Sequence, residues 1–189
     1  MRIIGGNAKG TLLVSPPGKA TRPTLGQVRE SIFNVLSNVG IQETRVLDLF
    51  AGTGAMGLEA LSRGAKEAVF FDKVTARIIK ENSKRCHVED KVQVMAGDIR
   101  VALRHMRPKS YDYIFMDPPY NKGYVNEILS LLFACSLPAD NAIIIVEHSI
   151  TEPPDLSLFT EKCTVWKEKR KRDMAVTYLL CENDRGESS

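Results

Sequence analysis

Short apolar runs alternate with amphipathic segments from residue 45 onward, and this rhythm predicts strands and helices in turn. The apolar runs predict strands at Arg45–Phe50, Ala68–Asp72, Val92–Ala96, Tyr111–Asp117 and Ala142–His148. The amphipathic segments predict helices at Gly54–Arg63, Thr75–His87, Ile99–Met106 and Tyr124–Cys135. Apolar strands separated by helices are typical of β-α units on a parallel sheet, so we expect an α/β fold.

The first residues form a different pattern. Two apolar runs, Arg2–Gly6 and Thr11–Ser15, flank the turn-forming segment Asn7–Gly10, which predicts a β-hairpin. Apolar positions from Val28 to Leu36 then fit one face of a helix, with Thr24 as its expected N-cap. We therefore expect an N-terminal arm made of a hairpin and a helix.

The pattern changes again after Pro153-Pro154. Two apolar runs, Cys163–Lys169 and Met174–Cys181, lie on either side of Arg172-Asp173 and predict a closing antiparallel hairpin. The polar end of the chain is expected to be frayed. We expect one domain with an arm over 1–40, a core over 41–181 and a tail over 182–189.

Length and cysteine usage narrow the class of protein. The chain has 189 residues, of which 43% are hydrophobic, enough for one domain with a real core. No apolar stretch approaches the ~20 residues that span a bilayer, and we see no signal peptide. The four cysteines are far apart without a C-x-x-C pair, which argues against a zinc site or a disulfide framework. We expect a cytoplasmic protein with no metal and no membrane partner.

Charge is uneven along the chain although the net charge is only +3. Every charge before Glu30 is positive, and a second basic run covers Lys167–Arg172. Polyanions are attracted to such segments. Solvated surface faces are the alternative explanation, and the two explanations weigh about equally for the pair of patches.

Acidic residues fall near the ends of the predicted strands, at Asp48, Asp72, Asp98, Asp117 and Glu147. Ligands of open parallel sheets bind beyond the carboxyl ends of the strands. The set as a whole therefore predicts a binding site, although a solvated loop acid is the better interpretation of Glu147.

The first predicted loop contains a G-x-G-x-x-G pattern at Gly52, Gly54 and Gly57. With Asp72 about 20 residues on, this pattern is found in NAD-dependent oxidoreductases, which remain an alternative. Asp48 argues against them, because a carboxylate at that position would repel a pyrophosphate. It suits a cationic ligand such as S-adenosylmethionine, which carries an ammonium and a sulfonium and needs no helix N-terminus for a phosphate.

The sequence Asp117-Pro118-Pro119-Tyr120 is the sharpest chemical signal. An exocyclic amine on a nucleobase is a poor nucleophile, and two acceptors aimed at its N–H groups would favour the tetrahedral geometry needed for attack. The Asp117 carboxylate and the Pro118 carbonyl can serve as those acceptors, and Asp117 can take up the proton. The prolines fix the backbone, and Tyr120 can stack on the base. A proline-rich turn without a catalytic role is the alternative.

These motifs resemble those of the class I methyltransferases and, more narrowly, of the RsmD family, which methylates guanine N2 in small-subunit ribosomal RNA. The matching segments are Arg2–Gly6 with Gly10, Arg22–Thr24, Val28–Glu30, Phe33-Asn34, Asp48–Gly54, Gly57–Ala60 and Asp117–Tyr120. Family members often carry glutamate where this chain has Asp72, and the run Lys167–Arg172 has no firm match.

The resemblance implies a Rossmann-like, seven-stranded, mostly parallel sheet with an antiparallel last strand. It implies that S-adenosylmethionine is the cofactor, with its methionine moiety on the Asp48–Gly54 loop and its ribose on Asp72. The expected residues are Asp48, Phe50, Gly52, Gly54, Asp72, Asp98 and Ile99 for the cofactor, Asp117, Pro118, Pro119 and Tyr120 for catalysis, and Arg22, Thr24 and Arg29 for RNA.

The expected activity is therefore methyl transfer to guanine N2 of ribosomal RNA, within a small-subunit particle, by a monomer. DNA adenine-N6 or cytosine-N4 methylation uses the same motif, and a related motif serves glutamine in release factors. The short chain lacks the target-recognition sequence or large N-terminal domain that those enzymes carry. A non-catalytic RNA-binding assembly factor is the alternative from another class.

Overall fold

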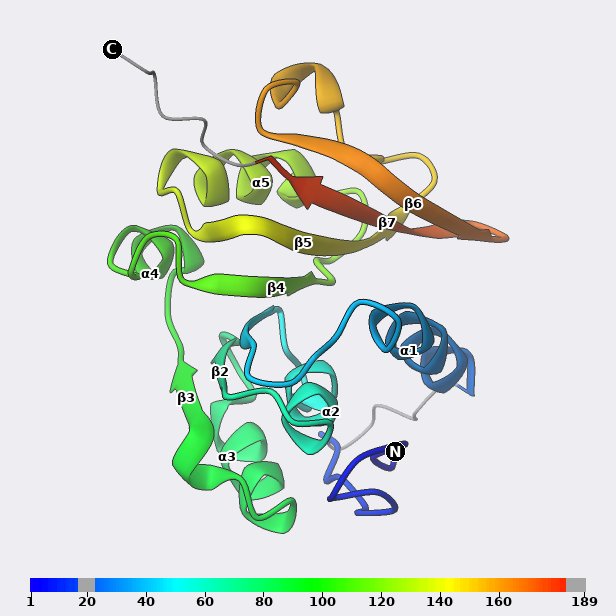
Figure 1. Ribbon diagram of the computed structural model, residues 1–189, viewed down its shortest axis with the longest axis vertical. Helices are drawn as coiled ribbons and strands as arrows, with labels where there is room; N and C mark the ends of the chain where they lie inside the picture. Colours follow the sequence, from blue (N-terminus) through cyan, green and yellow to red (C-terminus); the bar gives the residue numbers. More distant parts are fainter. Residues whose placement is uncertain (17–22, 183–189) are drawn as a thin grey trace. The chain divides into compact units, whose positions relative to one another are not determined.

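The computed structural model describes residues 1–16 and 23–182 (Figure 1). Its helices are α1 (Pro23–Leu36), α2 (Ala55–Ser62), α3 (Ala76–Arg85), α4 (Ile99–Arg104) and α5 (Tyr124–Ala134), with short 3-10 turns η1 (Glu89–Lys91) and η2 (Leu156–Leu158). Its strands are β1 (Arg45–Leu49), β2 (Glu67–Phe71), β3 (Val92–Met95), β4 (Tyr111–Met116), β5 (Pro138–Ser149), β6 (Cys163–Lys171) and β7 (Met174–Cys181).

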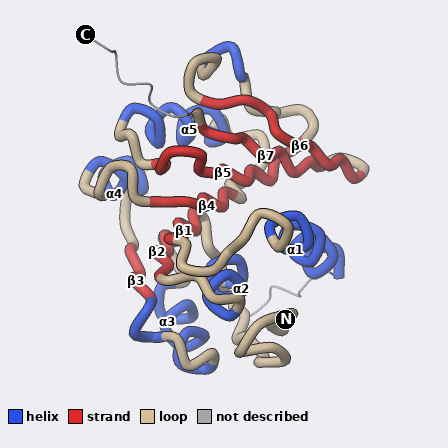
Figure 2. The backbone as a smooth tube through the Cα atoms, in the orientation of Figure 1, coloured by secondary structure: helices blue, strands red, loops and turns tan. Residues whose placement is uncertain are grey.

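The strands form a seven-stranded sheet in the order β3-β2-β1-β4-β5-β7-β6. β1, β2 and β3 pair in parallel, as do β4 and β5, whereas β7 runs antiparallel to both β5 and β6. Strands and helices alternate along the chain from α1 to β5 (Figure 2). The predicted fold class, with its antiparallel last strand, is confirmed.

The chain divides into two compact units, Met1–Ala96 and Gly97–Ser189. The division into arm, core and tail stays a prediction, and residues 183–189 of the predicted tail lie outside the described residues. None of the helices in the described ranges is both long and apolar enough to cross a bilayer.

In the first unit, β1 and β2 carry the apolar runs that the sequence predicts, and every residue after the first of each strand is buried. Helix α2 contacts both strands, and helix α3 contacts β3. The contact with β2 is very close at Gly57, because a Cβ there would lie 2.4 and 2.6 Å from two ring atoms of Phe70. Glycine at this position therefore lets α2 approach the sheet.

Replacement of Gly57 with alanine is expected to lower the free energy of unfolding by about 1–3 kcal/mol, since the added methyl group collides with the buried ring of Phe70. Gly26→Ala is the matched control, because Gly26 also lies in a helix and a Cβ there meets nothing within 4 Å. That control should be neutral or stabilising by up to about 1 kcal/mol. Denaturant unfolding measures both, and equal effects would contradict the close approach.

The N-terminal hairpin is present but short. Arg2 and Leu12 form an isolated antiparallel bridge, and the Ile3 amide donates to the Thr11 carbonyl at 3.0 Å. The turn leaves strand geometry because it attaches to the end of α2, where the Ser62 carbonyl accepts from the Asn7 amide at 2.7 Å. Helix α1 begins at Pro23, so Thr24 lies inside it and the predicted N-cap role is wrong. Proline suits a first helical turn, where its missing N–H is not needed.

In the second unit, β7 is buried almost throughout and β6 forms the exposed edge (Figure 1). Strand β5 begins four residues before the predicted boundary, at Pro138 instead of Ala142, because Tyr111 pairs with Pro138 ahead of an irregularity in the register. Asn141 has φ 60° in this segment. Polar residues in the irregular part hide the strand from an apolar pattern.

Candidate active site

The loop between β1 and α2 has an unusual backbone. Phe50, Gly52 and Gly54 all have positive φ, at 60°, 57° and 78°. Glycine adopts this left-handed region easily, whereas Phe50 is a rare non-glycine case. The Gly54 amide donates to the Ala51 carbonyl at 2.8 Å and closes the turn. The predicted cofactor residues of this loop therefore lie on one tight, exceptional turn.

Asp48 lies beneath this loop, at the end of β1, and is buried. Its Oδ2 accepts a hydrogen bond from the Gly57 amide at 2.9 Å. Burial raises the pKa of Asp48 from 3.8 to about 7, the Gly57 hydrogen bond opposes the rise, and the charge of Asp72 adds to it. An ionised Asp48 is costly without a cation nearby, so a positively charged ligand would be favoured here.

The raised pKa of Asp48 predicts a pH-dependent stability. The folded protein holds this proton more tightly than the unfolded chain, so the stabilisation is complete below about pH 4 and is lost as the pH rises to about 7. Relative to Asp48→Asn, the wild type should lose unfolding free energy across this range and change little above about pH 8. Urea unfolding of both proteins at each pH measures the difference, in which other titrating groups cancel. A difference that stays constant would refute the assignment.

Asp72 follows β2 and holds the same loop. Its Oδ2 accepts from the Gly52 amide at 2.9 Å, and its Oδ1 accepts from the Val74 and Thr75 amides at 2.8 and 2.9 Å. Burial raises the pKa of Asp72, but these amide hydrogen bonds outweigh it and lower the pKa. Asp72 is thus an anionic anchor beside the turn.

These contacts bear on the choice between NAD and S-adenosylmethionine. In dinucleotide-binding folds the glycine-rich loop and helix N-terminus present backbone N–H groups to a pyrophosphate. Here the Gly52 and Gly57 amides donate to the carboxylates of Asp72 and Asp48. The Asp72 carboxylate repels a phosphate, and an ionised Asp48 would be stabilised by a cation, so these two acceptors favour a ligand with an ammonium group.

A buried amide links the arm to this loop, and sequence reasoning did not identify it. Asn82 of α3 accepts from the Val14 amide at 2.7 Å and donates to the carbonyls of Val14 at 3.0 Å and Thr53 at 2.9 Å. A single polar residue on a helix face carries no signal of this kind in the sequence. The structure therefore shows that the arm and the glycine-rich loop share one anchor.

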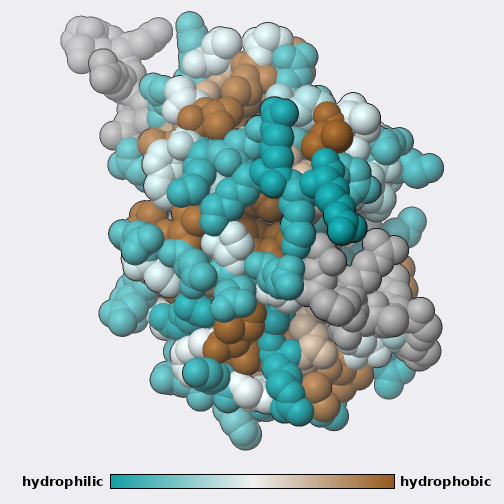
Figure 3. Space-filling model, turned by 90° about the vertical axis from the view of Figure 1, so that its right-hand side faces the viewer, coloured by the Kyte–Doolittle hydropathy of each residue, from teal (hydrophilic) through white to brown (hydrophobic). Residues whose placement is uncertain are grey.

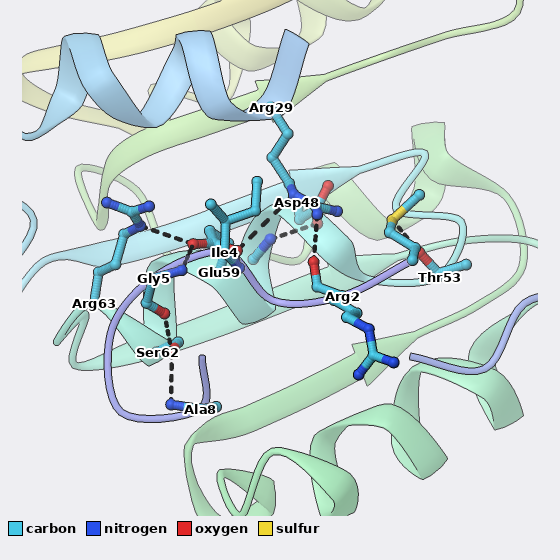
Figure 4. Close-up of polar contacts among 12 residues, drawn as sticks. Arg2, Ile4, Gly5, Ala8, Arg29, Asp48, Thr53, Glu59, Ser62 and Arg63 are labelled. Carbon is cyan, nitrogen blue, oxygen red and sulfur yellow. Dashed lines mark hydrogen bonds and ion pairs between the residues drawn. The ribbon is translucent and has the colours of Figure 1, made fainter. Parts of the chain in front are cut away.

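The residues predicted to contact RNA are only partly described. Arg22 lies outside the described residues, and Thr24 belongs to the first turn of α1. Arg29 is 4% exposed, and its Nη2 donates to the Arg2 carbonyl at 2.5 Å while its Nε lies 3.9 Å from Glu59 Oε2 (Figure 4). Because this position leaves almost no surface for a phosphate, we now assign Arg29 to holding the arm.

Glu59 is the centre of that attachment (Figure 4). This residue of α2 is 0% exposed, and its carboxylate accepts from the amides of Ile4 and Gly5 at 2.8 and 2.7 Å. It also accepts from Arg63 Nε at 2.8 Å. A buried carboxylate thus joins the start of the chain to the helix that follows the glycine-rich loop.

Asp98 and Ile99, the residues predicted to lie at the adenine, are at the start of α4 in the second unit. Asp98 Oδ1 accepts from the Arg100 amide at 2.8 Å, which makes Asp98 the N-cap of the helix. The Asp98 side chain is exposed and Ile99 is buried. An exposed carboxylate that caps a helix can still accept a further hydrogen bond, and the adenine contact stays a prediction.

The segment Asp117–Tyr120 follows β4, and its residues differ in burial. Asp117 and Pro119 are exposed, Pro118 is buried, and the Tyr120 hydroxyl donates to Glu147 Oε1 at 2.9 Å. Burial and the nearby Glu147 carboxylate raise the pKa of Tyr120. This hydrogen bond fixes the hydroxyl end of the tyrosine ring, and the residue is still 38% exposed.

The interpretation of Glu147 as a solvated loop acid is wrong. The residue is half-buried near the end of β5, and burial raises its pKa while the Tyr120 hydrogen bond opposes the rise. β4 and β5 are parallel neighbours, so their carboxyl ends meet at one edge and bring this acid to the motif. The position of Glu147 near the end of a predicted strand was the sequence feature that pointed to this location.

A second acid clamps the backbone just after the motif. Glu152 Oε1 accepts from the Gly123 amide at 2.6 Å, and its Oε2 accepts from the Asn121 amide. Asn121 and Gly123 have φ 56° and 75°, and the Thr151 hydroxyl donates to Asn121 Oδ1 at 2.9 Å. Sequence reasoning missed this clamp, because it joins positions about 30 residues apart in a loop without a motif. It fixes an exceptional backbone beside the predicted catalytic residues.

Within the described part of the chain, no group of three or more His, Cys, Asp or Glu side chains is placed to hold a metal ion. All four cysteines are free thiols, and Cys86, Cys163 and Cys181 are buried.

Comparison with known proteins gives concordant matches over nearly the whole chain. The family model described as "Conserved hypothetical protein 95" matches residues 1–180. Ribosomal RNA small subunit methyltransferase D of Escherichia coli K12 is 36% identical over 176 residues, covering 86% of this chain and 84% of the relative. The protein of the same name from Haemophilus influenzae is 33% identical over 187 residues, covering 97% and 94%.

A solved structure shares the fold as well. The structure of yhhF from Escherichia coli aligns with a TM-score of 0.83 and 31% identity, covering 96% of this chain and 98% of that one. The family match, the relatives and the shared fold agree, and the chain belongs to the RsmD family of methyltransferases.

Proposed function

We propose that this protein transfers a methyl group from S-adenosylmethionine to the exocyclic N2 amine of a guanine in small-subunit ribosomal RNA. The observation that carries the proposal is the loop after β4, in which Asp117 is exposed and the Tyr120 hydroxyl donates a hydrogen bond to Glu147. The relatives, named as small-subunit ribosomal RNA methyltransferases, support the substrate class.

The residues of the first unit fit the proposed cofactor. When bound, S-adenosylmethionine supplies an electrophilic methyl group on a sulfonium. The buried Asp48 favours a positively charged methionine moiety, and the turn through Phe50, Gly52 and Gly54 offers backbone for close approach. Asp72, anionic and anchored, suits the ribose hydroxyls. Asp98 and Ile99 are assigned to the adenine.

The residues of the second unit would prepare the amine. The Asp117 carboxylate and the Pro118 carbonyl accept hydrogen bonds from the two N–H groups and localise the nitrogen lone pair. As the new N–C bond forms and the methyl carbon–sulfur bond breaks to leave a neutral thioether, Asp117 would take up the proton that the nitrogen releases. Tyr120 stacks on the base, and Pro119 stiffens the backbone between them. The acids Glu147 and Glu152 keep this loop in place.

The protein would act as a cytoplasmic monomer, and its partner would be ribosomal RNA within a small-subunit particle. DNA adenine-N6 or cytosine-N4 methylation remains the alternative chemistry, because Asp117–Tyr120 fits any exocyclic base amine. The relatives' names favour ribosomal RNA.

Isotopically labelled S-adenosylmethionine tests the proposal directly. The substrates are small-subunit particles and ribosomal RNA from cells that lack this gene, with genomic DNA alongside, and products are digested to nucleosides and identified by mass. N2-methylguanosine from RNA is the expected result. Label in DNA adenine or cytosine would show that DNA, and not ribosomal RNA, is the substrate. No label in any substrate would refute the proposal that the protein is a methyltransferase of nucleic acids.

A further inference from the structure

The edge strand β6 presents an aromatic and basic surface that the proposed reaction does not use. β6 is the last strand in the order of the sheet, and seven of its nine residues are exposed. Trp166 and Val165 are 43% and 44% exposed, and the basic run Lys167–Arg172 follows them directly. Figure 3 faces the side on which the β6–β7 turn lies in Figure 1, and hydrophilic side chains crowd that part of the surface.

An irregularity in the strand places Trp166 with the lysines. Val165 pairs with Leu179 and Lys167 pairs with Tyr178, so Trp166 is an extra residue in the ladder. The Trp166 ring meets the Tyr178 ring edge-on at 6.1 Å between centroids. Tyr178 is the cross-strand partner of Lys167, so these two side chains lie on the same face of the sheet. Trp166 contacts Tyr178 and therefore lies on that face too, as expected where a bulge redirects a side chain.

The same face continues along the strand as a row of cations. Lys167, Lys169 and Lys171 alternate with Glu168 and Arg170, so the three lysines share one face. The single acid of the run is engaged on the opposite face, where Glu168 accepts from Arg170 Nε at 2.6 Å and from the Thr177 hydroxyl at 3.1 Å. Glu168 therefore makes these contacts on the face opposite to the lysines.

Protection of a sheet edge explains only part of this arrangement. Lysines on an edge strand discourage pairing with another sheet. A large exposed tryptophan has the opposite effect, because apolar aromatic surface favours association. A ring beside a row of cations is, by contrast, the combination that binds the bases and phosphates of RNA.

We propose that Trp166 and the lysine row Lys167, Lys169 and Lys171 form a docking face for the RNA substrate, with the ring stacked on an unpaired base and the lysines on phosphates. This inference rests on the proposed function. It assigns a part in the recognition of RNA to the C-terminal hairpin.

The test compares three variants for binding to ribosomal RNA at several salt concentrations. Lys167→Glu with Lys169→Glu should weaken binding at least about tenfold and reduce the salt slope by about two. Trp166→Ala should weaken binding about 5- to 100-fold with an unchanged slope, since stacking is not ionic. Lys80→Glu with Lys91→Glu, an equal change of charge on exposed residues, is the control and should have a much smaller effect.

Cofactor affinity, steady-state kinetics and the oligomeric state separate the possible outcomes. Affinity for S-adenosylmethionine should match the wild type in all variants, and KM for RNA should rise with kcat retained. The inference is overturned if the variants bind RNA as the control does, or if Trp166→Ala only changes a dimer into a monomer. The proposed function fails separately, if the wild type forms no N2-methylguanosine.

Discussion

Replacement of Asp117 with alanine is expected to reduce methyl transfer at least about 10³-fold while leaving the affinity for S-adenosylmethionine within about twofold. Loss of one acceptor aimed at developing charge costs about 10²–10³ in rate, and loss of a proton acceptor costs about as much again. The side chain is exposed, so its removal should disturb the fold little. Single-turnover transfer and equilibrium binding of the cofactor measure the two quantities independently.

Asp117→Asn separates the two roles assigned to the carboxylate. Its carbonyl oxygen still accepts a hydrogen bond from the amine, but the amide takes up no proton at neutral pH. We therefore expect this variant to be faster than Asp117→Ala and slower than the wild type. Wild-type turnover in either variant would exclude Asp117 from the chemistry.

The fold was predictable from the sequence because its strands are local, apolar and regular. β1, β2 and β7 are mostly apolar and almost entirely buried, and their predicted boundaries lie within one residue of those observed. β5 shows where this logic ends, since its first residues are held by pairing with β4 and not by their own hydrophobicity. The start of α1 shows the same limit, because the sequence pattern placed the N-cap at Thr24 whereas the helix begins at Pro23.

The site divides along the same line. Asp48, Asp72 and Asp117 were predicted as site residues because each lies at or near the carboxyl end of a predicted strand, where parallel sheets bind ligands, and their roles stay predictions. Glu152 and Asn82 were not found, since each acts on backbone about 30 or more residues away along the chain. Arg29 was misassigned because counting charges does not distinguish a solvated cation from one buried against Glu59.

That buried pair leads to the largest expected effect on stability. Glu59→Ala should lower the free energy of unfolding by about 3–5 kcal/mol, because it leaves the buried Arg29 without its carboxylate and the Ile4 and Gly5 amides without an acceptor. Urea unfolding measures the loss. The arm should also become more accessible to protease, since Glu59 holds the start of the chain on α2.

The chain supplies a closely matched control in α3. Glu81 and Arg85 form the same i,i+4 pair at 3.1 Å as Glu59 and Arg63 do at 2.8 Å, but their side chains are 51% and 44% exposed. Glu81→Ala should cost less than about 1 kcal/mol, as exposed pairs do. The two variants remove the same group from the same helical spacing and differ in burial and in the backbone amides that Glu59 accepts. Equal losses of stability would mean that the arm is not anchored by Glu59, and a loss confined to Glu59→Ala would show that this carboxylate fastens the arm to the catalytic fold.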